Sequence, residues 1–339
     1  MQYSKEKYQW LGKVPIGIGA IMKGWAIKES DFRKKTELPV VDFRAMTNAC
    51  PHDCFHCFTD KNKKTLTLKE IKTVIDQLAK LKTKSINYLG EGEPTIDPDF
   101  LEIIEYTVKK KIQPIIFTDA ATMLLDKKLV KRLNQLKVTI CPKMDSLYNE
   151  KYQNWVVGDK TNTYFKKRNQ AIKLLMKEGF NKIEKDGTTR LGFDMVLSKK
   201  NKADVPKILR WCRQNNIFVV FANYLPSGRS GKSDFNQSLV LSQKELISIK
   251  KKINSIDKDE FNYDHTHLNA NNFYTIKCVE YMQIFGDGRV SPCGGCEKII
   301  GNVKKDQIKY IITNLNKEFP NFAVDKRDGS CPFRPKVNC

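Results

Sequence analysis

The sequence predicts an α/β protein, a partial (β/α)6 barrel followed by a small cysteine-rich C-terminal extension. Strand and helix patterns alternate six times between residues 38 and 230, which indicates a mainly parallel sheet with helices outside it. A complete eight-fold barrel needs about 250 residues, so roughly 190 residues fit a partial barrel better. Half of the 10 cysteines lie beyond residue 263. A doubly wound sheet would show the same alternation, and that alternative stays open.

The six predicted strands are short apolar segments, and a helical pattern follows each of the first five. The strands are residues 40–45, 86–89, 112–118, 137–144, 190–197 and 217–224. The first helix opens with a capping box, Thr67 with Glu70. The other helices are predicted at residues 97–111, 124–136, 164–178 and 203–215. Loops at the carboxyl ends of the strands are expected to carry the chemistry.

Four parts are expected along the chain. They are an N-terminal segment (1–37), the barrel core (38–230), a linker and helix (231–262) and the cysteine-rich extension (263–339). Residues 226–238 are polar and rich in Gly and Ser, which is typical of a linker or an active-site loop. Ser242 and Glu245 cap a further predicted helix, residues 243–256.

The composition favours a cytoplasmic protein with no membrane partner. The 339 residues include no apolar run long enough to span a bilayer, and the first ten lack the apolar stretch of a signal peptide. The net charge of +22 would suit a nucleic acid. Because the lysines are spread over every segment, a nucleic-acid partner is not favoured. Grouped cysteines in a reducing compartment indicate metal rather than disulfides.

Cys50, Cys54 and Cys57 follow the first predicted strand with the spacing C-x3-C-x2-C. Three thiolates on one loop can hold three corners of a [4Fe–4S] cluster. The fourth iron then has no protein ligand nearby and can bind a substrate or cofactor. The alternative is a structural zinc site with His52 or His56 as the fourth ligand.

This cysteine motif after a first strand resembles the radical S-adenosylmethionine (radical SAM) superfamily. After the second strand, Gly90-Glu91-Gly92-Glu93-Pro94 is similar to the Gly-Gly-Glu-Pro motif of that family, which meets the methionine amino group of S-adenosylmethionine. Later matches follow the third to sixth strands in order. The resemblance implies these cofactor-binding residues: Gly90, Gly92, Glu93, Pro94, Thr118, Asp119, Arg190, Asn201, Leu225 and Arg229.

Two positions depart from the family pattern. His56 stands before the last cysteine, where relatives usually carry an aromatic hydrophobic residue, and Asp119 stands where they often have Asn. Neither departure removes a cluster ligand, but both affect details of the cofactor contact.

The C-terminal cysteines contain the pattern C-x9-G-x4-C, from Cys278 through Gly288 to Cys293. This resembles the start of a SPASM or twitch extension, and Asp287-Gly288 is by itself a hairpin signal. The resemblance implies one auxiliary [4Fe–4S] cluster on Cys278, Cys293 and two further cysteines. The candidates for those two are Cys296, Cys331 and Cys339. A zinc knuckle is the alternative.

Cys141, Lys143 and Asp145 alternate along the fourth strand and therefore share a face. If that face lines the barrel, Cys141 could donate a hydrogen atom and Lys143 or Asp145 could act as acid or base. The alternative, which is favoured for Cys141, is a small buried core residue.

The resemblance implies reductive cleavage of S-adenosylmethionine to a 5′-deoxyadenosyl radical, which abstracts hydrogen from a substrate. An auxiliary cluster would favour net oxidation, and epimerisation stays open. The first hypothesis is a small-molecule substrate, with a low-potential electron donor of the flavodoxin or ferredoxin type. The alternatives are a peptide-modifying maturase, a nucleic-acid-modifying enzyme and a non-enzymatic zinc protein. Residues 1–39 are short for the leader-binding domain that many maturases carry.

Overall fold

The computed structural model divides into two compact units. It describes residues 38, 40–59, 66–185, 188–224, 226, 228–261, 268–269, 281–292 and 298–318. Unit 1 contains residues 51–59 and 118–269, and unit 2 contains residues 38–50, 66–117 and 281–318. The residues 1–37 lie outside the described part, as do six predicted site residues: Leu225, Cys278, Cys293, Cys296, Cys331 and Cys339.

Unit 2 is built on one sheet in which strand β1 (Val40–Phe43) is central. β1 pairs in parallel with β2 (Ser85–Tyr88) on one side and with β8 (Tyr281–Ile284) on the other. The order of strands is β10-β9-β8-β1-β2-β3. The remaining strands are β3 (Gln113–Thr118), which runs parallel to β2 and whose last residue belongs to unit 1, and the antiparallel β9 (Arg289–Ser291) and β10 (Gly301–Asn302).

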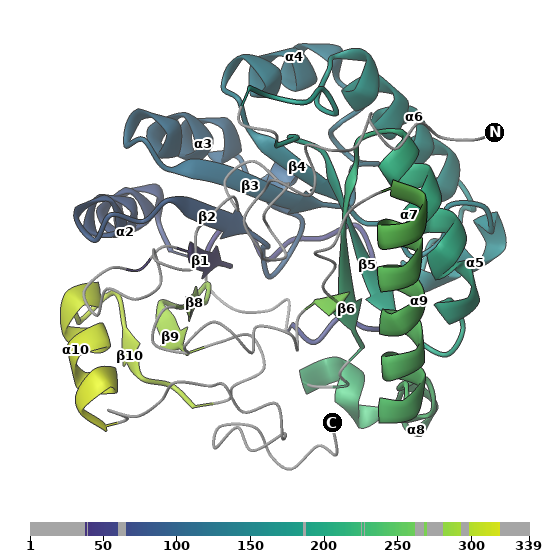
Figure 1. Cartoon of the computed structure of the whole chain (residues 1–339). Coiled ribbons are helices and arrows are strands. Elements are labelled where there is room, and N and C mark those ends of the chain that lie inside the picture. The colour runs from purple at the N-terminus through teal and green to yellow at the C-terminus, as the bar shows by residue number, and fades with distance from the viewer. Residues whose placement is uncertain are drawn as a thin grey trace. The chain divides into compact units, whose positions relative to one another are not determined.

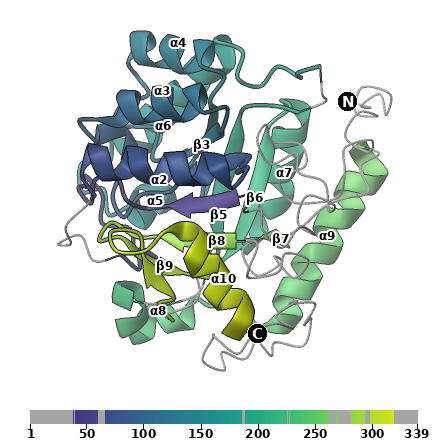
Figure 2. The same ribbon diagram turned by 90° about the vertical axis from the view of Figure 1, so that its left-hand side faces the viewer.

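Helices α2 (Leu68–Lys80), α3 (Phe100–Lys109) and α10 (Ile308–Glu318) belong to this unit (Figure 1). The predicted capping box of α2 is confirmed, because Thr67 and Glu70 exchange both of their hydrogen bonds. α10 lies beside α2 (Figure 2), and the backbone N–H of Ile308 donates to the side chain of Gln77 at 2.8 Å.

The C-terminal hairpin is confirmed at the predicted turn, where Gly288 has φ = +86° between β8 and β9. Only glycine adopts this conformation without steric cost. The pairing of β8 with β1 and the helix α10 were not predicted, since the region after residue 262 looked irregular in the sequence. The C-terminal segment therefore extends the sheet of unit 2.

Unit 1 contains the other parallel strands, of which β5 (Gly192–Leu197) and β6 (Phe218–Asn223) pair along their whole length. β4 (Thr139–Pro142) joins β5 through parallel bridges, and β7 (Leu268–Asn269) pairs in parallel with β6. The helices are α4 (Lys127–Gln135), α5 (Glu150–Val156), α6 (Tyr164–Lys177), α7 (Val205–Gln214), α8 (Asp234–Ser238) and α9 (Gln243–Phe261). All six predicted strands are thus present and separated by helices, which confirms the α/β class with parallel strands.

Two helices of unit 1, α5 and α8, were missed, and α9 extends beyond its predicted end at residue 256. None of the helices in the described part of the chain is long and apolar enough to cross a membrane.

The helices α7 and α9 run side by side (Figures 1 and 2) and share two Arg–carboxylate pairs. Arg213 and Asp257 are nearly inaccessible and form two hydrogen bonds of 2.8 and 2.9 Å. Arg210 and Glu260 form a similar pair at the surface, with bonds of 2.8 and 2.6 Å. The same type of Arg–carboxylate pair therefore occurs once in a buried position and once at the surface.

We expect Asp257→Ala to lower the free energy of unfolding by about 3–5 kcal/mol, because it leaves the Arg213 charge buried without its partner. Glu260→Ala is the matched control and should cost about 1 kcal/mol or less, because solvent screens its pair. Urea unfolding of both variants measures the difference. Equal losses would show that burial of the inner pair carries no extra cost.

Candidate cofactor site

The cysteine motif lies on the loop that leaves β1, and its later part is held firmly within unit 1. Cys50, Cys54 and Cys57 are all half-buried. The backbone N–H groups of Asp53 and Phe55 donate to carbonyls at the end of α5, at 2.9 and 3.2 Å. A further bond of 3.0 Å, from the N–H of Cys57 to the carbonyl of Cys54, closes a turn between these two cysteines.

The surroundings of Cys57 favour a metal ligand. Burial raises the pKa of its thiol, but hydrogen bonds to Thr59 and the Arg229 guanidinium outweigh burial, so the pKa is lowered. The Sγ of Cys57 lies 3.1 Å from the Thr59 hydroxyl. Because the thiolate is the form that binds metal, this environment fits an iron–sulfur cluster. Arg229, a predicted cofactor residue, also forms an ion pair with Asp53.

Asp119, which follows β3, holds the cysteine loop through His52. The imidazole Nε2 of His52 and the Oδ2 of Asp119 are 2.6 Å apart, and both side chains are about nine-tenths buried. The carboxylate also accepts from the N–H and the hydroxyl of Thr122, at 3.0 and 2.5 Å. The hydroxyl of Tyr164 donates to the Asp119 carbonyl at 3.1 Å. Asp119, which stands where relatives often have Asn, thus pairs with His52 of the cysteine loop.

The zinc alternative at this loop needs His52 or His56 as a ligand and stays open, because a metal-ligating imidazole commonly donates its other ring N–H to a carboxylate. His52 is engaged by Asp119. Among the residues that the structure describes, no group of three or more His, Cys, Asp or Glu side chains meets as the site of a single metal ion.

In unit 2, the glycine motif packs directly on the chain that leads into Cys50. Gly90 has φ = +65°. A Cβ added to Gly92 would lie 2.0 Å from the carbonyl oxygen of Ala49. The N–H of Gly92 donates to Thr47, and the N–H of Glu93 donates to Ala49, at 3.1 and 2.9 Å. Glycine is required at position 92 because the two segments touch through their backbones.

Glu93 and Pro94 begin a short helical turn, η3 (Pro94–Ile96). Glu93 is buried, and its Oε1 accepts from the backbone N–H and the hydroxyl of Thr95, at 3.1 and 2.6 Å. This bonding sets the orientation of the Glu93 carboxylate.

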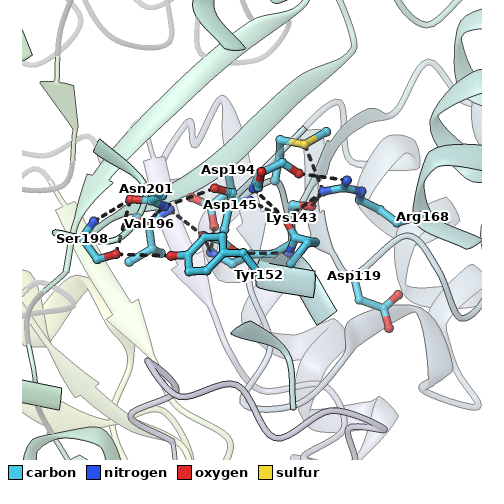
Figure 3. Close-up of polar contacts among 12 residues, drawn as sticks. Asp119, Lys143, Asp145, Tyr152, Arg168, Asp194, Val196, Ser198 and Asn201 are labelled. Carbon is cyan, nitrogen blue, oxygen red and sulfur yellow. Dashed lines mark hydrogen bonds and ion pairs between the residues drawn. The ribbon is translucent and has the colours of Figure 1, made fainter. Parts of the chain in front are cut away.

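A partly buried ion cluster joins the residues that follow β4 to the middle of β5 (Figure 3). The ammonium of Lys143 lies 3.0 Å from Asp145 and 3.5 Å from Asp194. Burial lowers the pKa of Lys143, but the two carboxylates outweigh burial and raise it. Lys143 is therefore a positive charge at neutral pH, which does not suit a general base. Of the candidate catalytic residues, Lys143 and Asp145 are thus brought together.

Cys141 is fully buried, and burial, followed by the charge of Asp194, raises the pKa of its thiol well above the usual range. This environment agrees with the alternative of a small core residue.

Asn201 closes the loop after β5. Its amide nitrogen donates to the carbonyls of Asp145 and Val196, at 3.2 and 2.9 Å, and its oxygen accepts from the N–H of Ser198 at 2.8 Å (Figure 3). Tyr152 reaches the same loop through the hydroxyl of Ser198, at 3.3 Å. Asn201 therefore fixes the ends of β4 and β5 relative to each other. The backbone carbonyl of Thr118 accepts a hydrogen bond from the backbone N–H of Lys143, at 2.9 Å.

The family model of the Radical SAM superfamily matches residues 45–212. The protein belongs to the radical SAM superfamily of enzymes. The superfamily implies a [4Fe–4S] cluster and S-adenosylmethionine as cofactors, and the cysteine and glycine loops described above fit these groups.

Similar proteins come from several branches of enzymes. The mycofactocin maturase MftC of Mycobacterium tuberculosis is 32% identical over 78 residues, which are 22% of this chain and 20% of that protein. A GTP 3′,8-cyclase of Listeria monocytogenes is 25% identical over 198 residues, 56% of this chain and 55% of the cyclase. The chain thus matches about half or less of the length of these relatives.

Two solved structures share the fold. Streptococcus suis SuiB bound to S-adenosylmethionine superposes with a TM-score of 0.65 at 17% identity, over 87% of this chain and 73% of SuiB. The structure of anSMEcpe with bound AdoMet and the Cp18Cys peptide gives 0.61 at 18% identity, over 83% of this chain and 81% of that one.

One predicted cofactor residue of this radical SAM enzyme, Arg190, has several polar contacts within unit 1. It precedes β5 at the amino end of the strand. Its guanidinium bonds to Glu184, Asn134 and the Val138 carbonyl, at 2.9, 2.6 and 3.3 Å, and lies over the Phe180 ring. Cofactors bind at the carboxyl ends of parallel strands, so these contacts favour a structural role for Arg190.

An aromatic group around Phe55 was missed. Phe55 stacks on Trp155 with ring centroids 4.9 Å apart, and Tyr152 stacks on the same indole. Tyr224 and Phe235 complete the group with edge contacts. Tyr152 and Trp155 are three residues apart, a spacing that indicates a shared helix face. The sequence gives no sign that this face contacts the cysteine loop.

His56, at the usual aromatic position of the family, is half-buried in the loop between Cys54 and Cys57. Burial first, and then the charge of Lys143, lowers its pKa to about 3. His56 is therefore a neutral ring at physiological pH and serves as a substitute for the usual aromatic residue.

We expect Asp119→Ala to lower the unfolding free energy by about 1.5–3 kcal/mol and to reduce iron retention, because the charge-assisted bond to His52 is lost. Asp126→Ala is the control, since Asp126 caps α4 and should cost about 0.5–2 kcal/mol without changing iron content. Iron is assayed after anaerobic reconstitution and gel filtration. Full iron in Asp119→Ala would contradict this role.

We expect Gly92→Ala to weaken S-adenosylmethionine binding by roughly tenfold or more, because the new methyl group must push the glycine loop off Ala49. In Gly231→Ala, the control, the new Cβ would meet its nearest atom at 3.3 Å, and binding should be unchanged. Equilibrium dialysis of the reconstituted proteins measures this. Unchanged affinity in Gly92→Ala would show that the loop does not meet the cofactor.

Proposed function

We propose that this protein holds a [4Fe–4S] cluster on Cys50, Cys54 and Cys57 and cleaves S-adenosylmethionine reductively for radical chemistry on a substrate. The observation that carries the proposal is the close packing of Gly92 on Ala49, next to Cys50 in the chain. This packing places the glycine motif and the start of the cysteine loop together in unit 2. Six parallel strands separated by helices support the partial-barrel arrangement of this superfamily.

When bound, the cluster and S-adenosylmethionine supply the 5′-deoxyadenosyl radical that abstracts a hydrogen atom. The chain contributes three thiolate ligands, of which Cys57 is favoured as a thiolate by Thr59 and Arg229. His52 and Asp119 position the loop. Glu93, oriented by Thr95, is the acceptor for the cofactor ammonium.

Lys143 gives the site a fixed positive charge, and Asp145 and Asp194 hold it in place. We propose that Lys143 binds or donates a proton to an anionic or carbonyl group, since an ammonium is a donor and not a base. Cys141 is not assigned a catalytic role, because its buried thiol fits core packing.

For the substrate we propose a peptide. The mycofactocin maturase is a relative at 32% identity, and SuiB has been solved bound to its precursor peptide SuiA with a TM-score of 0.64 to this chain. The small-molecule substrate expected from the sequence becomes the second candidate. The GTP 3′,8-cyclases favour it, because they align over the longer stretch of 198 residues.

The C-terminal cysteines lie outside the described residues, and the auxiliary cluster stays a proposal. Its support is the hairpin at Gly288, which is the structural element that the pattern from Cys278 to Cys293 implies. Such a cluster would accept an electron from the substrate and give net oxidation. The first electron would come from a flavodoxin or ferredoxin.

We expect the anaerobically reconstituted enzyme to contain about eight irons per chain, four for each cluster, and to release 5′-deoxyadenosine from S-adenosylmethionine with dithionite. Cys54→Ala should lose that release and fall to about four irons, because the radical SAM cluster lacks a ligand. Cys212→Ala is the control, since Cys212 is a buried residue of α7. It should retain both activity and iron.

Release that persists in Cys54→Ala, or a loaded wild-type enzyme that releases no 5′-deoxyadenosine, would overturn the proposed function. About four irons in the wild type, with release intact, would overturn only the auxiliary cluster.

A further inference from the structure

Four polar residues form a row across neighbouring strands of unit 2. Asp42 of β1 is in register with Asn87 of β2 and with Gln283 of β8, and Gln283 is in register with Ser291 of β9. Residues in register on adjacent strands project from the same face of a sheet. A hydrogen bond of 2.8 Å from Asn87 to Asp42 agrees with this placement. We call Ser291, Gln283, Asp42 and Asn87 the polar row.

The polar row faces away from the helices of unit 2. Tyr88, the residue after Asn87, points to the helix side, where its hydroxyl lies 2.5 Å from that of Thr107 in α3. Phe43 packs edge-on against Tyr88 and is in register with Ile284, so both lie on the helix side as well. Successive side chains alternate between faces, which places the polar row on the opposite face.

All four members of the polar row are buried, which is unusual for a run of polar side chains on a sheet. Gln283 is the informative member. It is 0% exposed, and within the described part of the chain neither its Oε1 nor its Nε2 has a hydrogen-bond partner. An unsatisfied buried amide costs free energy, and such groups in native proteins call for an explanation by function or by a bound molecule.

The polar row lies close to the glycine motif, because Asp42 and Asn87 belong to β1 and β2 and the motif follows β2. Arg44, two residues after Asp42, lies 3.5 Å from the Gly90 carbonyl through its Nη1. The N–H of Leu89, two residues after Asn87, donates to Phe43 at 3.2 Å. A molecule bound at the polar row would therefore lie close to the loop proposed to bind S-adenosylmethionine.

We propose that the carboxamide of Gln283 binds a peptide group of the substrate, with the polar row forming the floor of that subsite. This inference rests on the proposed function and specifies its substrate class. A carboxamide offers one acceptor and one pair of donor hydrogens side by side. An extended peptide residue offers its own N–H and C=O on the same side, as residues in antiparallel strands do when they exchange two hydrogen bonds. The two groups are complementary.

The probe is N-acetyl-alanine N-methylamide, a single residue with both peptide groups. Its partner probe is the ester analogue made from lactic acid, in which an oxygen replaces only the alanine N–H. Both are titrated by ligand-observed NMR into the full-length enzyme, loaded with clusters and S-adenosylmethionine. We expect the amide to bind wild type roughly tenfold more tightly than the ester, because the ester lacks the alanine N–H that would donate to Oε1.

In Gln283→Leu the two probes should bind equally. Met282→Leu, a change of similar size on the helix face, should keep the tenfold preference. The Gln283→Leu change itself is expected to preserve folding, because it removes two buried polar atoms that no described residue bonds to. Its melting temperature, measured alongside, should equal or exceed that of the wild type.

Three results would overturn the inference: equal affinities in the wild type, a preference that persists in Gln283→Leu, or no binding of the amide at all, as when a tightly held water occupies the carboxamide. The release of 5′-deoxyadenosine by the same preparations keeps this test separate from the proposed function. If release occurs and the preference is absent, only the subsite fails.

Discussion

The parallel pairing of β1 on both of its edges is the constraint on which unit 2 depends. All four residues of β1 are buried, and each is paired on one side with β2 and on the other with β8. A strand in this position cannot shift its register without moving every side chain to the wrong face. The start of the cysteine loop, which leaves β1, therefore has a fixed origin. The glycine motif leaves the neighbouring strand at the same end, and Gly92 can reach the backbone of Ala49.

In unit 1, polar groups that follow β4 and lie along β5 fix the positions of these two strands. The Lys143 ammonium lies between the carboxylates of Asp145 and Asp194 in a largely buried place, where an ammonium without a carboxylate would be costly. Asp145 also accepts from the N–H of Val196 at 3.1 Å, and Asn201 donates back to the Asp145 carbonyl. These bonds tie the two strand ends together. Asn201, a predicted cofactor residue, therefore also supports these strand ends through its hydrogen bonds.

The prediction succeeded where the signal is local. The six strands and the capping boxes at Thr67 and Ser242 are encoded by short runs of residues, and they appear where expected. The turn at Gly288 is equally local, because its backbone conformation selects glycine. For Arg190, which the sequence already placed at the start of the fifth strand, the structure adds the partners of its guanidinium. These partners come from two separate segments, residues 134–138 and Glu184.

The sequence by itself determined the cysteine spacing, the glycine motif and the order of strands and helices. These depend on covalent spacing and on local conformational preference. Tertiary structure alone decided that Asp119 pairs with His52, that His56 is neutral, and that β8 joins β1 and carries Gln283 into the polar row. Each of these joins residues far apart in the chain. Burial and hydrogen bonding stabilise these contacts, and both depend on which segments of the chain pack together.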